Sequence, residues 1–188
     1  GGSILGSKAI YSFLKNKIKK KFIFIDNLDE IFLKNIKKRH NLSKSLFLVI
    51  SKSGNTNETI VNLSYFKSFI KKTNTIILSE RKNNFLYNFA KKKRLTFIKH
   101  DPEIGGRYSV FSEVGMLPAY LMGLKVGNFK KDLNKLINSE KFLRRSIKEI
   151  NRLKLQKTKI LIFLNYVPEL NNFLYWCQQL LAESLGKN

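Results

Sequence analysis

The chain carries the stretch Leu46-Phe47-Leu48-Val49-Ile50-Ser51-Lys52-Ser53-Gly54-Asn55-Thr56-Asn57-Glu58-Thr59, in which an apolar run passes directly into a small, polar loop. The apolar run is short and partly β-branched, which is typical of a buried parallel strand. After the loop, apolar residues recur at helical spacing, at Ile60, Leu63, Phe66 and Ile70. A strand, a loop and a helix in this order predict one unit of an α/β fold.

The loop between this strand and this helix has the composition of a phosphate site. Its hydroxyls, ammonium group and flexible backbone come from Ser51, Lys52, Ser53, Gly54 and Thr56. A helix N-terminus favours an anion because its first N–H groups are unsatisfied and the helix dipole is positive there. The alternative is a plain turn in which Thr56 caps the helix and Glu58 or Thr59 supports its first turn. The loop alone leaves both interpretations open.

Similar alternation of strand-like and helix-like segments runs along the whole chain. The predicted strands are Phe22–Ile25, Leu46–Ile50, Thr75–Leu78, Leu95–Ile98 and Ile160–Leu164. The predicted helices begin at Ile4 and continue with Leu28–Lys38, Asn57–Lys72, Asn83–Lys93, Phe111–Leu124, Lys130–Arg152 and Val167–Ser184. This pattern predicts a three-layer α/β/α sandwich with a doubly wound, mostly parallel five-stranded sheet of the flavodoxin-like type.

Length and composition indicate an ordinary globular domain. The 188 residues are 43% hydrophobic and 26% charged, enough for one domain with a substantial core. No apolar run approaches the roughly 18 to 20 residues that span a bilayer, and no secretory leader opens the chain, so a cytoplasmic location is expected. The single cysteine, Cys177, excludes an internal disulfide and is expected to be a small buried hydrophobe rather than a nucleophile.

The formal net charge of +23 raises the possibility of a nucleic-acid-binding protein. The lysines, however, are spread over nearly every predicted helix and form no single basic arm. Asn and Ile are also abundant, which favours a bias in nucleotide composition over a selected binding face. Nucleic acid is therefore an unexpected partner, and a strong, salt-sensitive affinity for duplex DNA would count against this interpretation.

Two later segments also carry candidate functional residues. Glu103–Ser109 follows a predicted strand and holds two glycines beside Arg107, which could bind an anion or lie exposed at a structural turn. Glu183 lies near the end of the last predicted helix, among apolar residues. Burial there would raise its proton affinity, as suits a general base, although a surface glutamate at a helix end is the simpler interpretation.

Taken together, these segments resemble the glucose-6-phosphate isomerase family from Ser3 to Lys187. The stretch Ile104–Met116 is similar to the first signature of that family, and Ser51–Thr59 is similar to its phosphate loop. Gln179 and Ala182–Lys187 resemble the segment with its catalytic glutamate, and Gly1–Gly6 resembles its first glycine-serine loop. The resemblance implies a sugar isomerase (SIS) domain over residues 1–165, and a following helix over residues 166–188 that carries the glutamate.

The resemblance also implies roles for individual residues. Glu183 would be the base that moves a proton between C2 and C1 through a cis-enediol, with Arg107 offsetting the negative charge that develops on the oxygens. The substrate-binding residues it implies are Gly2, Ser3, Ser51, Lys52, Ser53, Thr56 and Gln179. The reaction would interconvert glucose 6-phosphate and fructose 6-phosphate in glycolysis and gluconeogenesis, with no metal and no redox cofactor. The alternative is a non-catalytic module of a regulator that binds a sugar phosphate.

The sequence departs from the family in its extent. The family's ring-opening histidine and a further lysine belong to segments beyond position 188, and His40 and His100 match no family motif, so both are expected to be ordinary loop residues. Both ends of the sequence are therefore expected to continue in a longer protein, including a strand ahead of Gly1. The 188-residue piece alone is expected to lack normal turnover, and the family implies a homodimer for the whole protein.

Overall fold

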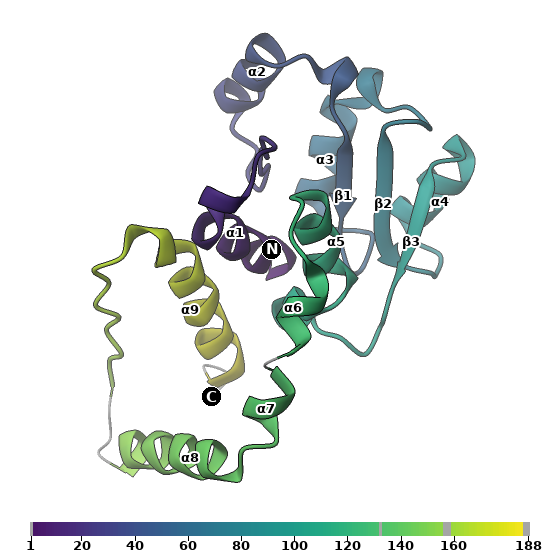
Figure 1. Cartoon of the computed structure of the whole chain (residues 1–188). Helices are drawn as coiled ribbons and strands as arrows, with labels where there is room; N and C mark the ends of the chain where they lie inside the picture. The colour runs from purple at the N-terminus through teal and green to yellow at the C-terminus, as the bar shows by residue number, and fades with distance from the viewer. Residues whose placement is uncertain (1, 132, 156–158, 186–188) are drawn as a thin grey trace.

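A computed structural model of the chain describes residues 2–131, 133–155 and 159–185 (Figure 1). It contains a parallel sheet of three strands in the order β1-β2-β3, which lies toward one side of the molecule in Figure 1. The strands are β1 (Phe47–Ile50), β2 (Thr75–Glu80) and β3 (Thr96–His100). Ile50 is paired with Leu78, and Leu78 with Ile98, so the carboxyl ends of all three strands meet at one edge. The predicted α/β fold with a parallel sheet is confirmed.

Helices flank the sheet. On one side, α3 (Asn57–Tyr65) and α4 (Phe85–Lys93) pack around the fully buried Ile77. Leu78 and His100 point to the other side, because side chains alternate along a strand; there α5 (Glu113–Leu121) contacts β3 through Glu113 and His100. Behind α5, α1 (Gly2–Phe13) packs between α5 and the last helix, α9 (Asn171–Leu185).

The remaining elements connect these layers. The helix α2 (Glu30–Arg39) is capped by Asp29, whose side chain accepts a hydrogen bond from the Phe32 amide. Three helices lead from α5 toward the last segment: α6 (Val126–Lys131), α7 (Leu133–Ile137) and α8 (Glu140–Leu155). The short 3-10 helices are η1 (Lys15–Lys17), η2 (Leu42–Lys44), η3 (Lys67–Phe69), η4 (Gly106–Phe111) and η5 (Pro168–Leu170). No helix in the described ranges has both the length and the apolar character that crossing a membrane requires.

Two of the five predicted strands are wrong. Phe22–Ile25 is not a strand: a cavity of about 560 Å³, lined by this segment and by Phe47–Ile50, separates it from β1. Its aromatic side chains instead pack on Tyr11, with ring centroids 5.9 Å away for Phe22 and 5.5 Å for Phe24. Without a neighbouring strand, an apolar run has no ladder of hydrogen bonds to join. The order β1-β2-β3 also contains no reversal, so a doubly wound sheet is not seen among these strands.

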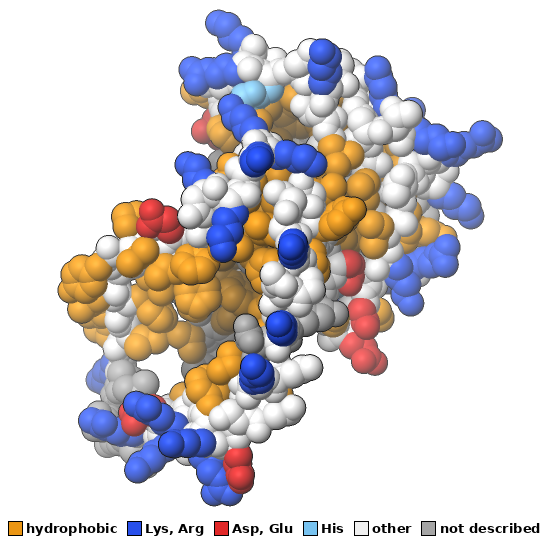
Figure 2. Space-filling view, viewed as in Figure 1, with side chains coloured by type: hydrophobic (Ala, Val, Ile, Leu, Met, Phe, Trp, Pro, Cys, Tyr) orange, Lys and Arg blue, Asp and Glu red, His pale blue; other side chains and the backbone are white. Residues whose placement is uncertain are grey.

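Ile160–Leu164 lacks strand structure as well, although its backbone is described throughout. It runs along the outside of the molecule before α9 (Figure 1), and Ile160 and Leu164 are 75% and 76% exposed. Figure 2 shows hydrophobic side chains gathered in this region, whereas Lys and Arg side chains are spread around the other helices of that face. The predicted apolar run is therefore present but has nothing among the described residues to pair with.

The predicted helix Lys130–Arg152 is divided. The structure ends α7 at Ile137 and begins α8 at Glu140. At the break, the Ser139 hydroxyl accepts a hydrogen bond from the Phe142 amide at 3.3 Å, as a helix N-cap does. A side chain that satisfies the first amides of a helix stabilises a new start, which a search for apolar spacing alone does not detect.

Candidate functional site

The loop after β1 is ordered by its own hydroxyl groups. The buried Ser51 hydroxyl lies 2.7 Å from the Thr56 hydroxyl and accepts a hydrogen bond from the Gly54 amide at 3.2 Å. Thr56 stands at the N-cap position of α3, but its side chain makes no capping hydrogen bond to that helix. The alternative in which Thr56 is a simple side-chain cap is therefore wrong, and the first amides of α3 have no side-chain cap there.

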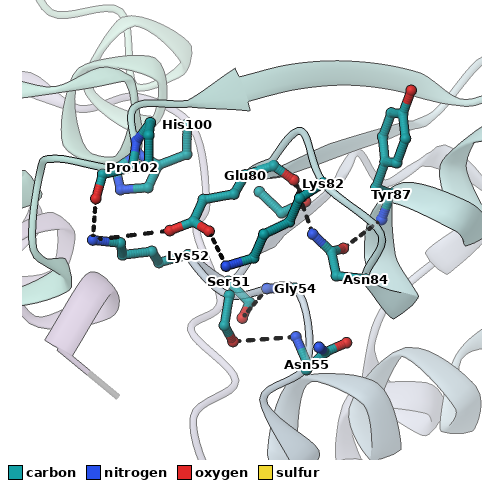
Figure 3. Close-up of polar contacts among 12 residues, drawn as sticks. Ser51, Lys52, Gly54, Asn55, Glu80, Lys82, Asn84, Tyr87, His100 and Pro102 are labelled. Carbon is teal, nitrogen blue, oxygen red and sulfur yellow. Dashed lines mark hydrogen bonds and ion pairs between the residues drawn. The ribbon is translucent and has the colours of Figure 1, made fainter.

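Two asparagines lie where this loop meets the start of α4 (Figure 3). Asn55 belongs to the loop, and Asn84 is the N-cap residue of α4. Gly54 adopts a positive φ of 69°, and a Cβ at this position would lie 2.0 Å from Asn84 Oδ1. Asn84 caps α4 by accepting from the Tyr87 amide at 2.9 Å, and Asn55 Oδ1 accepts from the Phe85 amide at 2.9 Å. The loop therefore packs directly against the N-terminus of α4, at a distance that only glycine allows.

Most of the predicted substrate-binding residues come together around one cavity of about 300 Å³. Its lining includes all of them except Gln179, namely Gly2, Ser3, Ser51, Lys52, Ser53 and Thr56. Gly2 and Ser3 belong to the start of α1, which is far from the others in sequence but lines the same cavity. The cavity is also lined by carboxylates that the sequence analysis did not single out, among them Glu80 at the end of β2.

Lys52 is held by protein groups at this cavity. Its ammonium donates to the Pro102 carbonyl at 2.7 Å and lies 3.9 Å from the Glu80 carboxylate, which also pairs with Lys82 (Figure 3). The buried Glu80 is thus shared by two lysines, and Lys52 links the loop after β1 to the loop after β3. An anion entering the cavity would compete with Glu80 for the Lys52 charge.

The other predicted residues form a second cluster, between η4 and α9. The Arg107 guanidinium donates to Glu183 Oε2 at 3.0 Å, and Gln179 Nε2 donates to Glu183 Oε1 at 2.8 Å. Gly2 adjoins this cluster: a Cβ there would lie 3.1 Å from the Arg107 amide and 3.2 Å from the Gln179 amide group. The structure therefore brings together Arg107, Gln179 and Glu183, with Gly2 between them and the phosphate loop.

Glu183 is more exposed than the sequence analysis predicted. Its side chain is 46% exposed and ion-paired with Arg107, so apolar burial does not surround it. The burial among apolar residues that was expected of Glu183 is therefore not met. Of the segment expected around it, Gly186 and Lys187 lie outside the described residues.

Tyr108 and Ser184 connect the same two elements beside the cluster. The Tyr108 hydroxyl lies 2.7 Å from the Ser184 hydroxyl, and this hydrogen bond, followed by the influence of Arg107, lowers the pKa of Tyr108. Tyr108 in turn raises the pKa of Arg107, with a smaller contribution from Glu183. Arg107 therefore keeps its full charge at the point where an anionic group would lie.

Buried polar atoms without hydrogen-bond partners occur both at the 300 Å³ cavity and in the cluster around Glu183. Among the described residues, three buried side-chain atoms have no hydrogen-bond partner: Asn62 Oδ1, Arg107 Nε and Gln179 Oε1. Asn62 lines the 300 Å³ cavity, and the other two belong to the Glu183 cluster. A buried donor or acceptor without a partner is costly, so these atoms point to groups that a polar ligand would supply. No group of three or more His, Cys, Asp or Glu in the described part of the chain could hold a metal ion.

Comparison with known proteins gives a consistent result. The profile of the phosphoglucose isomerase family matches residues 1–188. The chain is 34% identical to a glucose-6-phosphate isomerase of Methanocaldococcus jannaschii and 31% identical to one of Acholeplasma laidlawii; each match covers all of this chain and 49% of the relative. A crystal structure of a hypothetical protein from Thermus thermophilus superposes with a TM-score of 0.87 at 28% identity, over 100% of this chain and 48% of that one. The chain thus spans about half the length of the relatives it matches.

Proposed function

Since the chain belongs to the phosphoglucose isomerase family, we propose that it forms part of an enzyme that interconverts glucose 6-phosphate and fructose 6-phosphate. The observation that carries the proposal is the position of Arg107, Gln179 and Glu183 next to a cavity lined by the other predicted substrate-binding residues. A base, a cation and an anion site are the parts that this isomerisation needs.

In the proposed mechanism, the phosphate lies in the cavity and the sugar extends toward α9. The Glu183 carboxylate removes the proton from C2 of the open-chain aldose, which gives a cis-enediol, and returns that proton to C1 of the ketose. One proton also moves from the C2 hydroxyl to the C1 oxygen, so the product is an isomer of the substrate. Arg107 stabilises the negative charge on these oxygens, and Gln179 orients them, using buried atoms that lack partners in this structure.

Before this chemistry, the ion pair between Arg107 and Glu183 has to open. Both carboxylate oxygens of Glu183 are engaged, one by Arg107 and one by Gln179. A base must reach the carbon-bound proton, so substrate oxygens would replace the carboxylate as partners of these two side chains. The exposed position of Glu183 leaves room for this exchange.

The complete protein is proposed to be a cytoplasmic homodimer in which the partner subunit contributes to the site. We do not propose a nucleic-acid-binding role, because the charge is the only feature that favours one.

The test is an isomerase assay of the complete protein beside the 188-residue chain, measured as conversion of fructose 6-phosphate to glucose 6-phosphate. Activity in the complete protein only is the expected result. If neither protein turns over substrate and both bind glucose 6-phosphate in calorimetry, the proposed enzyme is refuted in favour of a sugar-phosphate-binding module.

A further inference from the structure

His100 was expected to be an ordinary loop residue, and this expectation is wrong. It is the last residue of β3, its exposure is 0%, and both of its ring nitrogens have partners. Nδ1 contacts a carboxylate oxygen of Glu113, the first residue of α5, and Nε2 lies 3.1 Å from the Ile104 carbonyl oxygen. His100 therefore ties the loop that follows β3 to the start of α5.

The hydrogen-bond partners of His100 determine which of its ring nitrogens carry a proton. A carbonyl oxygen can only accept a hydrogen bond, so Nε2 must carry a proton to contact Ile104. A second proton is needed between Nδ1 and Glu113, because a bare ring nitrogen and a carboxylate would repel each other. The pair thus holds one proton more than a neutral imidazole and a free carboxylate hold together.

The loop that His100 holds leads directly to Arg107. Two side chains bind alternate carbonyls of this loop. Lys52 donates to the Pro102 carbonyl (Figure 3), and His100 donates to the Ile104 carbonyl. Gly105 and Gly106 follow, and their flexibility would otherwise let Arg107 move. The Arg107 backbone is thus held by β3 and α5 on one side. On the other side it is held by α9, where the Trp176 indole donates a hydrogen bond to the Arg107 carbonyl.

We propose that His100 and Glu113 share a proton and act as positioning residues that hold the loop 101–106, and with it Arg107. The charged groups around His100 are Glu113 on α5, Glu80 at the paired position of β2, Lys52 from the loop after β1, and Lys99, Asp101 and Glu103 on its own segment. Without the shared proton, the Nδ1 lone pair would face the Glu113 carboxylate and the loop would loosen. The consequence for turnover rests on the proposed function, whereas the proton and the loop do not.

The first test is nitrogen NMR of the 188-residue chain. It has two histidines, so a His40→Gln variant assigns the His100 signals at once. We expect Nδ1 of His100 to show a protonated, hydrogen-bonded signal at pH 7.5, and to lose it in Glu113→Gln, where the amide can donate to a bare nitrogen. An unprotonated Nδ1 in both proteins would overturn the proposal.

The second test is hydrogen exchange of the amides in residues 101–107. Glu113→Leu, which cannot bond to His100, should speed this exchange about tenfold, the effect of losing one hydrogen bond. Glu113→Gln should keep this exchange slow, because its amide can still bond to Nδ1 of His100. Glu103→Gln is the matched control, since this glutamate is exposed in the same loop. Equal exchange rates in the Leu variant and the control would show that the contact between His100 and Glu113 does not hold this loop.

In the complete protein, Glu113→Leu should lower kcat with KM little changed, and Glu113→Gln should keep kcat near that of the parent. If the complete protein has no isomerase activity, the proposed function fails, while the NMR and exchange results still decide whether His100 and Glu113 hold the loop. An active enzyme whose kcat is the same in Glu113→Leu and Glu103→Gln would refute the link between this contact and Arg107.

Discussion

Trp176 donates a hydrogen bond from its indole nitrogen to the carbonyl oxygen of Arg107 at 2.7 Å, although 69 residues separate the two in sequence. Trp176 is the single tryptophan of the chain. The helix α9 therefore holds Arg107 twice, by its backbone through Trp176 and by its side chain through Glu183.

Replacement of Trp176 should loosen this attachment. In Trp176→Phe the Arg107 carbonyl loses its donor, and we expect the free energy of unfolding to fall by about 1–3 kcal/mol. Urea unfolding followed by circular dichroism measures this. Tyr175→Phe is the control, because Tyr175 is 61% exposed on the same helix. Equal stability of the two variants would show that the hydrogen bond contributes nothing.

Replacement of the proposed base should abolish chemistry and spare binding. In the complete protein, Glu183→Gln keeps the size of the side chain but cannot accept a proton, so kcat should fall by about 10² to 10⁴ while KM stays similar. Glu169→Gln, at an exposed glutamate of η5, should retain kcat. A Glu183→Gln enzyme with the parent's kcat would remove Glu183 from the mechanism.

Gly54, in the loop after β1, should be harder to replace than Gly123, the other described glycine with a positive φ. Gly54→Ala forces a left-handed φ on a residue with a Cβ and drives that Cβ into Asn84, so we expect a loss of at least about 2 kcal/mol in unfolding free energy. Gly123→Ala separates the two effects: Gly123 has a φ of 85° but nothing within 4 Å of its Cβ position. This variant should lose only about 1 kcal/mol. Thermal unfolding of both variants checks the order, and equal losses would show that Asn84 simply moves away.

Cys177 should be a slow nucleophile. Burial raises the pKa of its thiol, and because the thiolate is the reactive form, less of it is present at a given pH. Alkylation by iodoacetamide at pH 8 should therefore be slower in the folded chain than in the same chain unfolded in urea. The gap should close as the pH is raised further. Equal rates at pH 8 would mean that the thiol is freely accessible.

The strand, loop and helix around Ser51–Thr59 could be predicted because their signals are local. A β-branched apolar run, a polar loop and helical spacing stand next to one another, and the structure has β1, the loop and α3 in those places. The assembly of Gly2 and Ser3 with Ser51 came from the family resemblance, since no local pattern connects residues so far apart in the chain.

The incorrect and missed predictions concern features that depend on contacts with other segments of the chain. Phe22–Ile25 and Ile160–Leu164 have the composition of strands, but pairing depends on a neighbour that composition does not reveal. His100 was missed because its role depends on Ile104 and Glu113, which only the turn after β3 brings to its ring. Glu80 was missed for a similar reason, as its two lysines come from different loops.

The packing of α1 against α9 also bears on how the protein is made. Gly2 leaves the ribosome long before Gln179, which adjoins it in the folded chain. Until α9 has been made, the face of α1 that α9 covers lacks this partner. Contacts this distant in sequence form late and slowly, so a chain whose synthesis stops before α9 would lack Gln179 and Glu183 and could not complete the candidate site.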